Sequence, residues 1–261
     1  MITRSPLPAR WSPRSLGIIL LMLAGWELAV RAGWYTGLFL PAPTAVGRAL
    51  GESLTGGALL LHLSATLLRI GAGLAIGGTA GLVLGVAMGS WRGLRAVLDP
   101  IVAAVHPVPK LALFPLLIVL LGIGEQSKIA AVAVGAFFPM LLNTMAGVQA
   151  ISPVHLELAR NYGASRWLMF QRVLLPGSLP MMLTGLRLAT NVAFHATIGV
   201  EMVGSRTGLG SVLWLSWQTF RIEQLFATLT VIALIGLGLT SLLREIARRS
   251  APWLIDHQMA V

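Results

Sequence analysis

The chain has 261 residues, of which 56% are hydrophobic and 11% charged, and its mean hydropathy is +0.82. Soluble domains usually carry about 25% charged residues, so the composition excludes an ordinary water-soluble fold. The absence of cysteine excludes disulfides, thiolate metal sites and cysteine nucleophiles. The net charge of +10 is better explained by arginines that hold loops on the cytoplasmic side of a membrane than by nucleic-acid binding.

The first apolar stretch, at about 15–33, follows a basic segment that runs from Met1 to Arg14. A signal peptide would end in a small-residue cleavage site, but Trp26 and Glu27 stand there instead. We therefore interpret this stretch as an uncleaved first transmembrane helix.

Three later stretches have no charged residue over about the 20 positions that a helix needs to cross the hydrocarbon core. They predict transmembrane helices at about 70–90, 129–149 and 224–243.

Two further apolar stretches are interrupted by polar or helix-breaking residues. The stretch at about 98–122 contains Lys110 beside Pro107 and Pro109, and the stretch at about 180–201 contains three polar side chains. Such residues need protein or water around them at membrane depth. Together the stretches predict an all-α integral membrane protein with about six transmembrane helices.

The basic residues predict which side of the membrane each loop occupies, because cytoplasmic loops carry an excess of Lys and Arg. With the N-terminus inside, the cytoplasmic segments hold Arg4, Arg10, Arg14, Arg92, Arg95, Arg160, Arg166, Arg172, Arg244, Arg248 and Arg249. The outer segments hold only Arg31, Arg48, Lys128, Arg206 and Arg221, and three basic residues (Arg69, Lys110 and Arg187) fall within or at the edges of spans. This bias predicts that both termini lie in the cytoplasm.

One cytoplasmic stretch, 152–176, is too long and too patterned for a simple turn between two spans. Ser152 is placed as an N-cap, with Pro153 at the first position of a short amphipathic helix that ends before Gly163. Ser165 is placed to cap a second helix through Arg172, which Pro176 is expected to stop. Two short helices joined at a glycine are typical of a docking element, although an amphipathic helix on the inner leaflet, anchored by Arg166 and Trp167, has the same pattern.

The same stretch resembles the signature of binding-protein-dependent ABC importer permeases, which reads Glu-Ala-Ala, three residues, Gly, nine residues, Ile-x-Leu-Pro. Here Glu157-Leu158-Ala159 precedes Gly163 by three residues, and Val173-Leu174-Leu175-Pro176 follows after nine. Leu158 and Val173 are apolar replacements, and the spacing is kept.

Further segments resemble the branch of this family that imports aliphatic sulfonates, taurine and nitrate. They are Leu40-Pro41-Ala42-Pro43, Leu111–Ile129, Phe137–Gly147, Leu175–Ala189, and Glu201-Met202 followed by Gly208-Leu209-Gly210. The resemblance covers roughly residues 35 to 250 and implies the type I ABC importer permease fold.

The resemblance implies a non-enzymatic transport subunit of the bacterial inner membrane, without a cofactor. Its partners would be two cytosolic ATP-binding subunits, a periplasmic or lipid-anchored substrate-binding protein and a second copy of the chain. It implies an N-terminal part (1–62), a permease domain (63–250) and a cytoplasmic tail (251–261). The residues expected to contact the ATPase are Glu157, Ala159, Tyr162, Gly163, Ala164 and Pro176.

Polar residues inside the spans are candidates for the transport pathway. Lys110 could attract a sulfonate, pair with an acidic residue such as Glu27, or extend its ammonium group to the membrane surface. Arg187, Asn191 and His195 recur at every fourth position, on one face of a helix that lines a pore or hydrogen-bonds to another helix.

Two features near the outer ends of the spans complete the candidate set. Glu201 would serve gating or cap its own helix, and the segment 204–221, with Trp214 and Trp217, is an interfacial or re-entrant segment. No metal site is expected, because His195 lacks a companion at ligand spacing.

The chain has no Gly-x4-Gly-Lys-Ser/Thr motif, so ATP hydrolysis would take place in a partner. The alternative is a secondary transporter or channel-like protein, which would typically show internal repeats and buried carboxylates. A membrane scaffold or enzyme subunit is a third class, for which the sequence offers no catalytic set.

Overall fold

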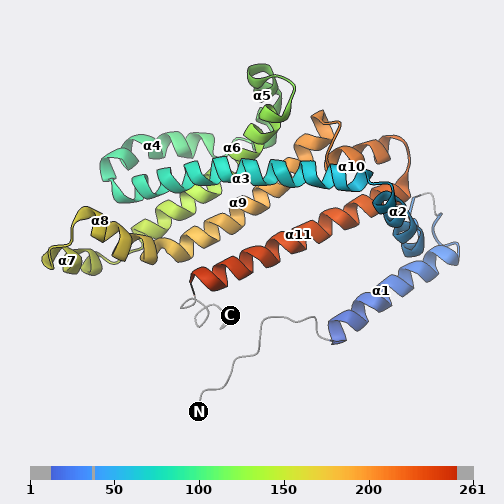
Figure 1. The fold of residues 1–261 in the computed structure, drawn as a ribbon, viewed down its shortest axis with the longest axis horizontal. Helices are drawn as coiled ribbons and strands as arrows, with labels where there is room; N and C mark the ends of the chain where they lie inside the picture. The colour runs from blue at the N-terminus through green and yellow to red at the C-terminus, as the bar shows by residue number, and fades with distance from the viewer. Residues whose placement is uncertain (1–12, 37–38, 252–261) are drawn as a thin grey trace, which may run out of the picture. The chain divides into compact units, whose positions relative to one another are not determined.

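The computed structural model describes residues 13–36 and 39–251, and every regular element in these ranges is a helix (Figure 1). The predicted all-α fold is confirmed. The described residues form two compact units, one of residues 13–36, 39–59 and 213–230 and the other of residues 60–212 and 231–251. The predicted cytoplasmic segment before residue 13 and the predicted tail after residue 251 lie outside the described residues.

The helices are labelled as in Figure 1, with η marking a 3₁₀ or π segment. In chain order they are α1 (Pro13–Arg31), α2 (Pro43–Thr55), α3 (Ala58–Ser90), α4 (Arg92–Val105), η1 (Lys110–Leu113), α5 (Phe114–Leu121), α6 (Glu125–Gln149), α7 (Pro153–Asn161), α8 (Arg166–Met169), η2 (Phe170–Leu174), α9 (Leu175–Gly204), α10 (Leu209–Gln218) and α11 (Ile222–Ser250).

Four helical stretches of the described chain are long and apolar enough to cross a membrane. They are Ala58–Ser90, Glu125–Gln149, Arg166–Gly204 and Ile222–Ser250, and they contain the helices predicted at 70–90, 129–149, 180–201 and 224–243. A fifth crossing is present if α4 and the following Lys110–Leu121 stretch count as one span. The first predicted span is the 19-residue helix α1, which carries Arg14, Glu27 and Arg31, so a sixth crossing there stays a prediction.

The predicted span at 98–122 is not one straight helix. Its two halves are bent by 88° at a break between Val105 and Lys110. Pro107 and Pro109 lie in this break, where each removes a backbone donor and disfavours a helical conformation in the residue before it. The segment is therefore a broken span or a re-entrant loop.

Glycines at every fourth position of α3 bring it into close contact with α6. A β-carbon at any of them would come within 3.0 Å of an α6 atom, so a larger residue would need the helices to separate. This close approach suits a membrane, where small residues allow helices to pack by van der Waals contact. The five positions are Gly73, Gly77, Gly81, Gly85 and Gly89.

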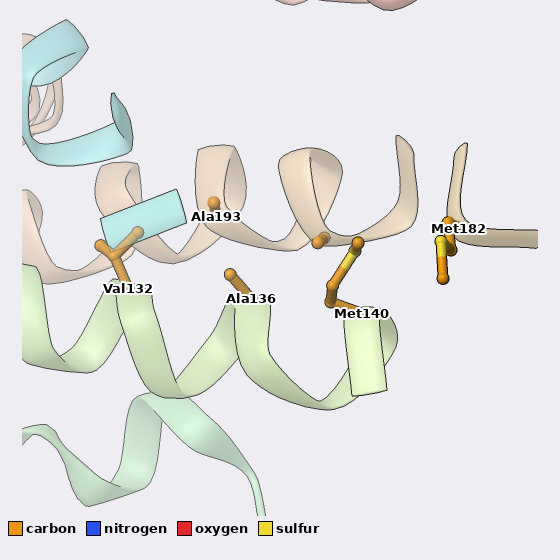
Figure 2. Close-up of a cluster of buried hydrophobic side chains, with 6 residues drawn as sticks. Val132, Ala136, Met140, Met182 and Ala193 are labelled. Atoms are coloured by element: carbon orange, nitrogen blue, oxygen red, sulfur yellow. The ribbon is translucent and has the colours of Figure 1, made fainter. Parts of the chain in front are cut away.

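Helix α6 also packs along α9, and the two helices form the centre of the larger unit. Figure 2 shows Val132, Ala136 and Met140 of α6 facing Ala193 and Met182 of α9. All five are buried, and α3 side chains pack against the same cluster. The α6–α9 pair thus gives the unit a rigid axis with two distinct ends.

The smaller unit is built around α1 and α2. Glu27 on α1 accepts hydrogen bonds from Arg31 Nε at 2.6 Å and from the backbone N–H of Thr44 at 3.1 Å. Thr44 follows Pro43 at the start of α2, so the Glu27 carboxylate satisfies a free N–H at that helix N-terminus. Pro43 ends the Leu-Pro-Ala-Pro motif noted above and occupies the first helical position.

Candidate functional sites at the two ends of the α6–α9 pair

The segment 152–176 forms one end of the pair, where α7 and α8 lie beyond α6 and α9 in Figure 1. Gly163 lies at the predicted turn between the two helices, with φ +74°, a left-handed conformation that glycine adopts without steric cost. Ser165 caps α8, because its hydroxyl accepts the backbone N–H of Leu168 at 3.2 Å. Ser152 occupies the predicted N-cap position of α7, but its side chain makes no capping hydrogen bond.

The prediction that Pro176 stops the second helix is wrong. Helix α8 continues through the π segment η2 into α9, and Pro176 sits in the first turn of α9. Pro176 lacks the N–H that a continuing helix would pair, and the hydrogen bonds of the run take the wider π pattern directly before it. In the π segment, the N–H of Leu175 bonds to the carbonyl of Phe170, five residues back.

Helix α7 presents an apolar row that nothing in the described chain covers. The exposed fractions are 67% for Val154, 53% for Leu158 and 84% for Tyr162, which follow one another at four-residue intervals. Glu157 and Gly163 are also exposed, whereas Ala159 and Ala164 are half-buried. Pro176 is exposed as well, so the predicted contact residues lie on or beside an open surface.

A charged network occupies the opposite end of the pair and centres on Arg69 of α3, which is 1% exposed. Its guanidinium donates to both carboxylate oxygens of Glu125, at 2.6 and 2.7 Å, and to Glu201 at 2.7 Å. It also donates to the carbonyl and the hydroxyl of Thr207, at 2.7 and 2.9 Å. All five N–H donors of the guanidinium are therefore used.

Glu201 is fully buried and does not cap its own helix. Its carboxylate accepts the backbone N–H of Gly210 at 2.9 Å, at the start of α10, and the hydroxyl of Thr66 at 2.9 Å. Gly208, with φ +113°, lies so close that a β-carbon there would overlap the Glu201 carboxylate. The two parts of the Glu201…Gly208-Leu209-Gly210 pattern in the sequence therefore contact each other in the fold.

Two further groups complete the network. Lys128 donates to Glu125 at 3.0 Å and to Ser205 at 3.0 Å. His62 accepts the Gly208 N–H at Nδ1 (3.0 Å), which requires that nitrogen to be unprotonated. Arg69 and Lys128 balance Glu125 and Glu201 in charge. In the ranges that the structure describes, no three His, Asp or Glu side chains are grouped to hold a metal ion.

Sequence reasoning selected Glu201 but missed Arg69 and Glu125. Arg69 was placed within or at the edge of a span, and Glu125 entered only as part of the Leu111–Ile129 segment that resembles the sulfonate branch. The available signal was an arginine at the start of a long uncharged stretch, because an arginine at membrane depth needs a carboxylate partner. The sequence does not show which carboxylate, since the partners are 56 and 132 residues away.

Lys110 lies at the break between α4 and α5, half-buried. Its ammonium group donates to the carbonyl of His106 and lies 4.6 Å from the centre of the Phe138 ring. Glu27, which was considered as an acidic partner for Lys110, accepts hydrogen bonds from Arg31 and Thr44.

The polar row of α9 is exposed along its whole length. Arg187, Asn191 and His195 all face away from the buried α6 contact, and His195 Nδ1 lies 2.7 Å from the Asn191 carbonyl. The face that packs on α6 includes Met182, Gly185, Ala189 and Ala193. A guanidinium exposed in the middle of a membrane-crossing helix needs water or another protein surface around it.

The family model described as "Binding-protein-dependent transport system inner membrane component" matches residues 77–255. The chain belongs to this family. The permease is accordingly a multi-pass membrane protein of the binding-protein-dependent ABC importer type, as the resemblance implied.

Two relatives connect the permease to the sulfonate and taurine branch. It is 34% identical to the taurine transport system permease protein TauC of Escherichia coli, over 92% of this chain and 89% of TauC. It is 30% identical to the putative aliphatic sulfonates transport permease protein SsuC of Bacillus subtilis, over 89% of this chain and 84% of SsuC.

The fold agrees with that of a solved importer. A chain of a bacterial alginate ABC transporter, in complex with an alginate pentasaccharide-bound periplasmic protein, superposes with a TM-score of 0.64 at 17% identity. The match covers 90% of the permease and 94% of that chain.

Proposed function

We propose that this permease forms the translocation pathway of an ATP-driven importer for a small anionic solute, with an aliphatic sulfonate as the first candidate. The observation that carries the proposal is the exposed α7–α8 segment with its Glu157…Gly163…Pro176 signature. The exposed apolar side chains of α7, at one end of the α6–α9 pair, are suited to bind in a groove on a partner protein. A separate ATPase is the required partner, because the chain has no phosphate-binding loop of its own.

The assembly proposed has two permease copies, two cytosolic ATP-binding subunits and a substrate-binding protein. The complex of the alginate transporter with its periplasmic protein supports the last partner. In this assembly both termini and the α7–α8 segment face the cytoplasm, and the Arg69 network lies at the outer end. Glu157 would pair with a basic group of the ATPase, beside Tyr162 and the half-buried Ala159 and Ala164.

The substrate proposal depends on charge as well as on the relatives. The named relatives transport taurine or aliphatic sulfonates, both of which carry a sulfonate group. Arg187 is exposed on α9 with its polar neighbours, and Lys110 lies at the break between α4 and α5. A guanidinium suits an oxyanion because it offers parallel N–H donors.

Purification of the permease with its genomic neighbours tests the function as a whole. We expect an ATP-binding subunit to co-elute, and uptake of a radiolabelled sulfonate to stop when the phosphate-binding loop of that subunit is mutated. A panel of taurine, longer alkanesulfonates, nitrate and heterocyclic precursors would identify the substrate. Uptake that persists without ATP would support the secondary transporter instead.

Replacing Gly163 with valine is expected to abolish most uptake while the membrane helices remain folded. A β-branched residue at φ +74° costs about 1–2 kcal/mol in backbone strain, so the turn between α7 and α8 would change shape. The measurement is substrate-stimulated ATP hydrolysis in the assembled transporter, which should fall with uptake.

The matched control is Gly163→Asn, because asparagine adopts the left-handed conformation more readily than valine. We expect this variant to retain most of its coupling. Equal activity of the valine and asparagine variants would show that the turn geometry is not required for coupling.

Replacing Arg187 with methionine should reduce sulfonate uptake without reducing assembly with the ATPase. The substitution keeps an unbranched side chain and removes the positive charge, so an anion would lose an attractive group in the pathway. Arg221→Met, at an exposed arginine just before α11, is the control. Normal uptake in the Arg187 variant would remove this residue from the pathway.

A further inference from the structure

The two carboxylates bound to Arg69 differ sharply in their surroundings. Glu201 is 0% exposed, and both of its oxygens are occupied by Arg69, Thr66 and the Gly210 N–H. The side chain of Glu125 is 51% exposed. Water can replace the partners of Glu125 but cannot reach Glu201.

The two carboxylates also differ in the helices and turns that they connect. Glu201 joins α9 to α3 and to the start of α10, through buried bonds that are costly to break. Glu125 is the first residue of α6, and the contacts of Arg69 with Glu125 and Thr207 bring that helix start next to the turn at 205–208. Half of the network can therefore open while the other half stays formed.

We propose that Arg69 is a positioning residue for transport. Its bonds to Glu125 and Thr207 form a latch that holds the start of α6 against the 205–208 turn and opens during the transport cycle, while the Arg69–Glu201 pair stays formed. Lys128 belongs to the same latch, because it bonds to Glu125 and to Ser205 of the turn. This inference rests on the proposed transport function, since a latch that opens and closes needs a cycle to drive it.

The physical basis is the difference in solvation. Hydrogen bonds between charged groups at a half-exposed site exchange for bonds to water at small net cost, whereas an unpaired charge at a buried site has no such substitute. When Glu125 and Thr207 are released, water must enter beside Arg69, which is 1% exposed in the closed arrangement, to accept its freed N–H donors, while the pair with Glu201 keeps the guanidinium in place. Arg69 then stays positioned to close the latch again.

Distance measurements between two spin labels test the latch directly. Labels go on Gln126→Cys, beside Glu125, and Arg206→Cys, in the turn, both at exposed positions. The chain has no native cysteine, so the unmodified permease serves as the diluent that suppresses distances between copies. The sample is the assembled transporter in lipid nanodiscs, with and without trapping by ATP and vanadate.

We expect one narrow distance distribution without nucleotide and a second, longer population after trapping. Glu125→Gln should populate the longer distance even without nucleotide, and lower the maximal uptake rate roughly tenfold at unchanged KM. Glu125→Asp, which keeps the charge, should restore part of the narrow distribution. Thr207→Val removes only the hydroxyl contact. It should shift the distance distribution in the same direction as Glu125→Gln, but by a smaller amount.

The control is Glu223→Gln, an exposed acid outside the network, which should leave distances and uptake unchanged. The latch is overturned if Glu125→Gln and trapping both leave the distribution as it is in the unmodified protein. It is also overturned if the Gln and Asp variants lose uptake equally with unchanged distances. If uptake proves independent of ATP, the proposed function fails, but the distances of the nucleotide-free Gln variant still decide whether the latch exists.

Discussion

Replacing Arg69 with methionine should destabilise the permease by about 3–5 kcal/mol, because it leaves the buried Glu201 carboxylate without its counter-ion. Thermal unfolding in detergent, followed by the fluorescence of the eight tryptophans, should show a midpoint lowered by on the order of 10 °C. The Gly210 N–H and the Thr66 hydroxyl would still contact Glu201, but neither carries a full charge.

Two comparisons isolate the cause of this loss. Arg248→Met removes a guanidinium that is 60% exposed and paired with Glu245, and it should change the midpoint very little. The double variant Arg69→Met with Glu201→Leu should be more stable than Arg69→Met alone, because no unpaired charge is left buried. A single variant as stable as Arg248→Met would contradict the assigned role of the pair.

Replacing Gly77 with leucine is expected to disrupt the packing of α3 on α6. A β-carbon at this position would overlap the backbone of Ala133, and a backbone cannot move aside as a side chain does. Overpacking of this kind typically costs about 1–3 kcal/mol and more where the partner is rigid, so we expect little folded protein at 37 °C. Size-exclusion chromatography of the solubilised membranes gives the folded fraction.

Gly71→Leu is the matched control, because it lies on the same helix and a β-carbon there meets no atom within 4 Å. We expect this variant to fold and to transport normally. If the two variants behave alike, close packing on α6 does not account for the glycines of α3.

The fold was predictable from the sequence where it depends on apolar length. The charge-free stretches at 70–90, 129–149 and 224–243 all lie inside single helices, because hydrocarbon leaves a backbone few alternatives. The prolines at 107 and 109 indicated an interruption, but not a bend of 88°, which depends on tertiary packing. The prediction for Pro176 was wrong for a related reason, because the π segment that precedes this proline in a continuous helical run is not visible in the neighbouring residues.

The candidate sites also contain some features that were predictable from the sequence and others that were not. The left-handed Gly163 and the Ser165 cap follow from local geometry, and both were predictable from neighbouring residues. The Arg69 network was not, because it joins residues from four helices and a turn across long separations in the chain. Local patterns show that a charge at membrane depth needs a partner, but only the packing shows which partner it has.

The unbroken helical run from Arg166 to Gly204 has a mechanical consequence. It starts in the segment proposed to contact the ATPase. It ends just after Glu201, whose carboxylate accepts the Gly210 N–H at the start of α10. Helix α9 alone has 30 residues and is roughly 45 Å long at 1.5 Å per residue. In the proposed transporter, movement of the ATPase-contacting segment would therefore be transmitted along one continuous helical run, through its π segment and Pro180, to the contacts of Glu201 with α10.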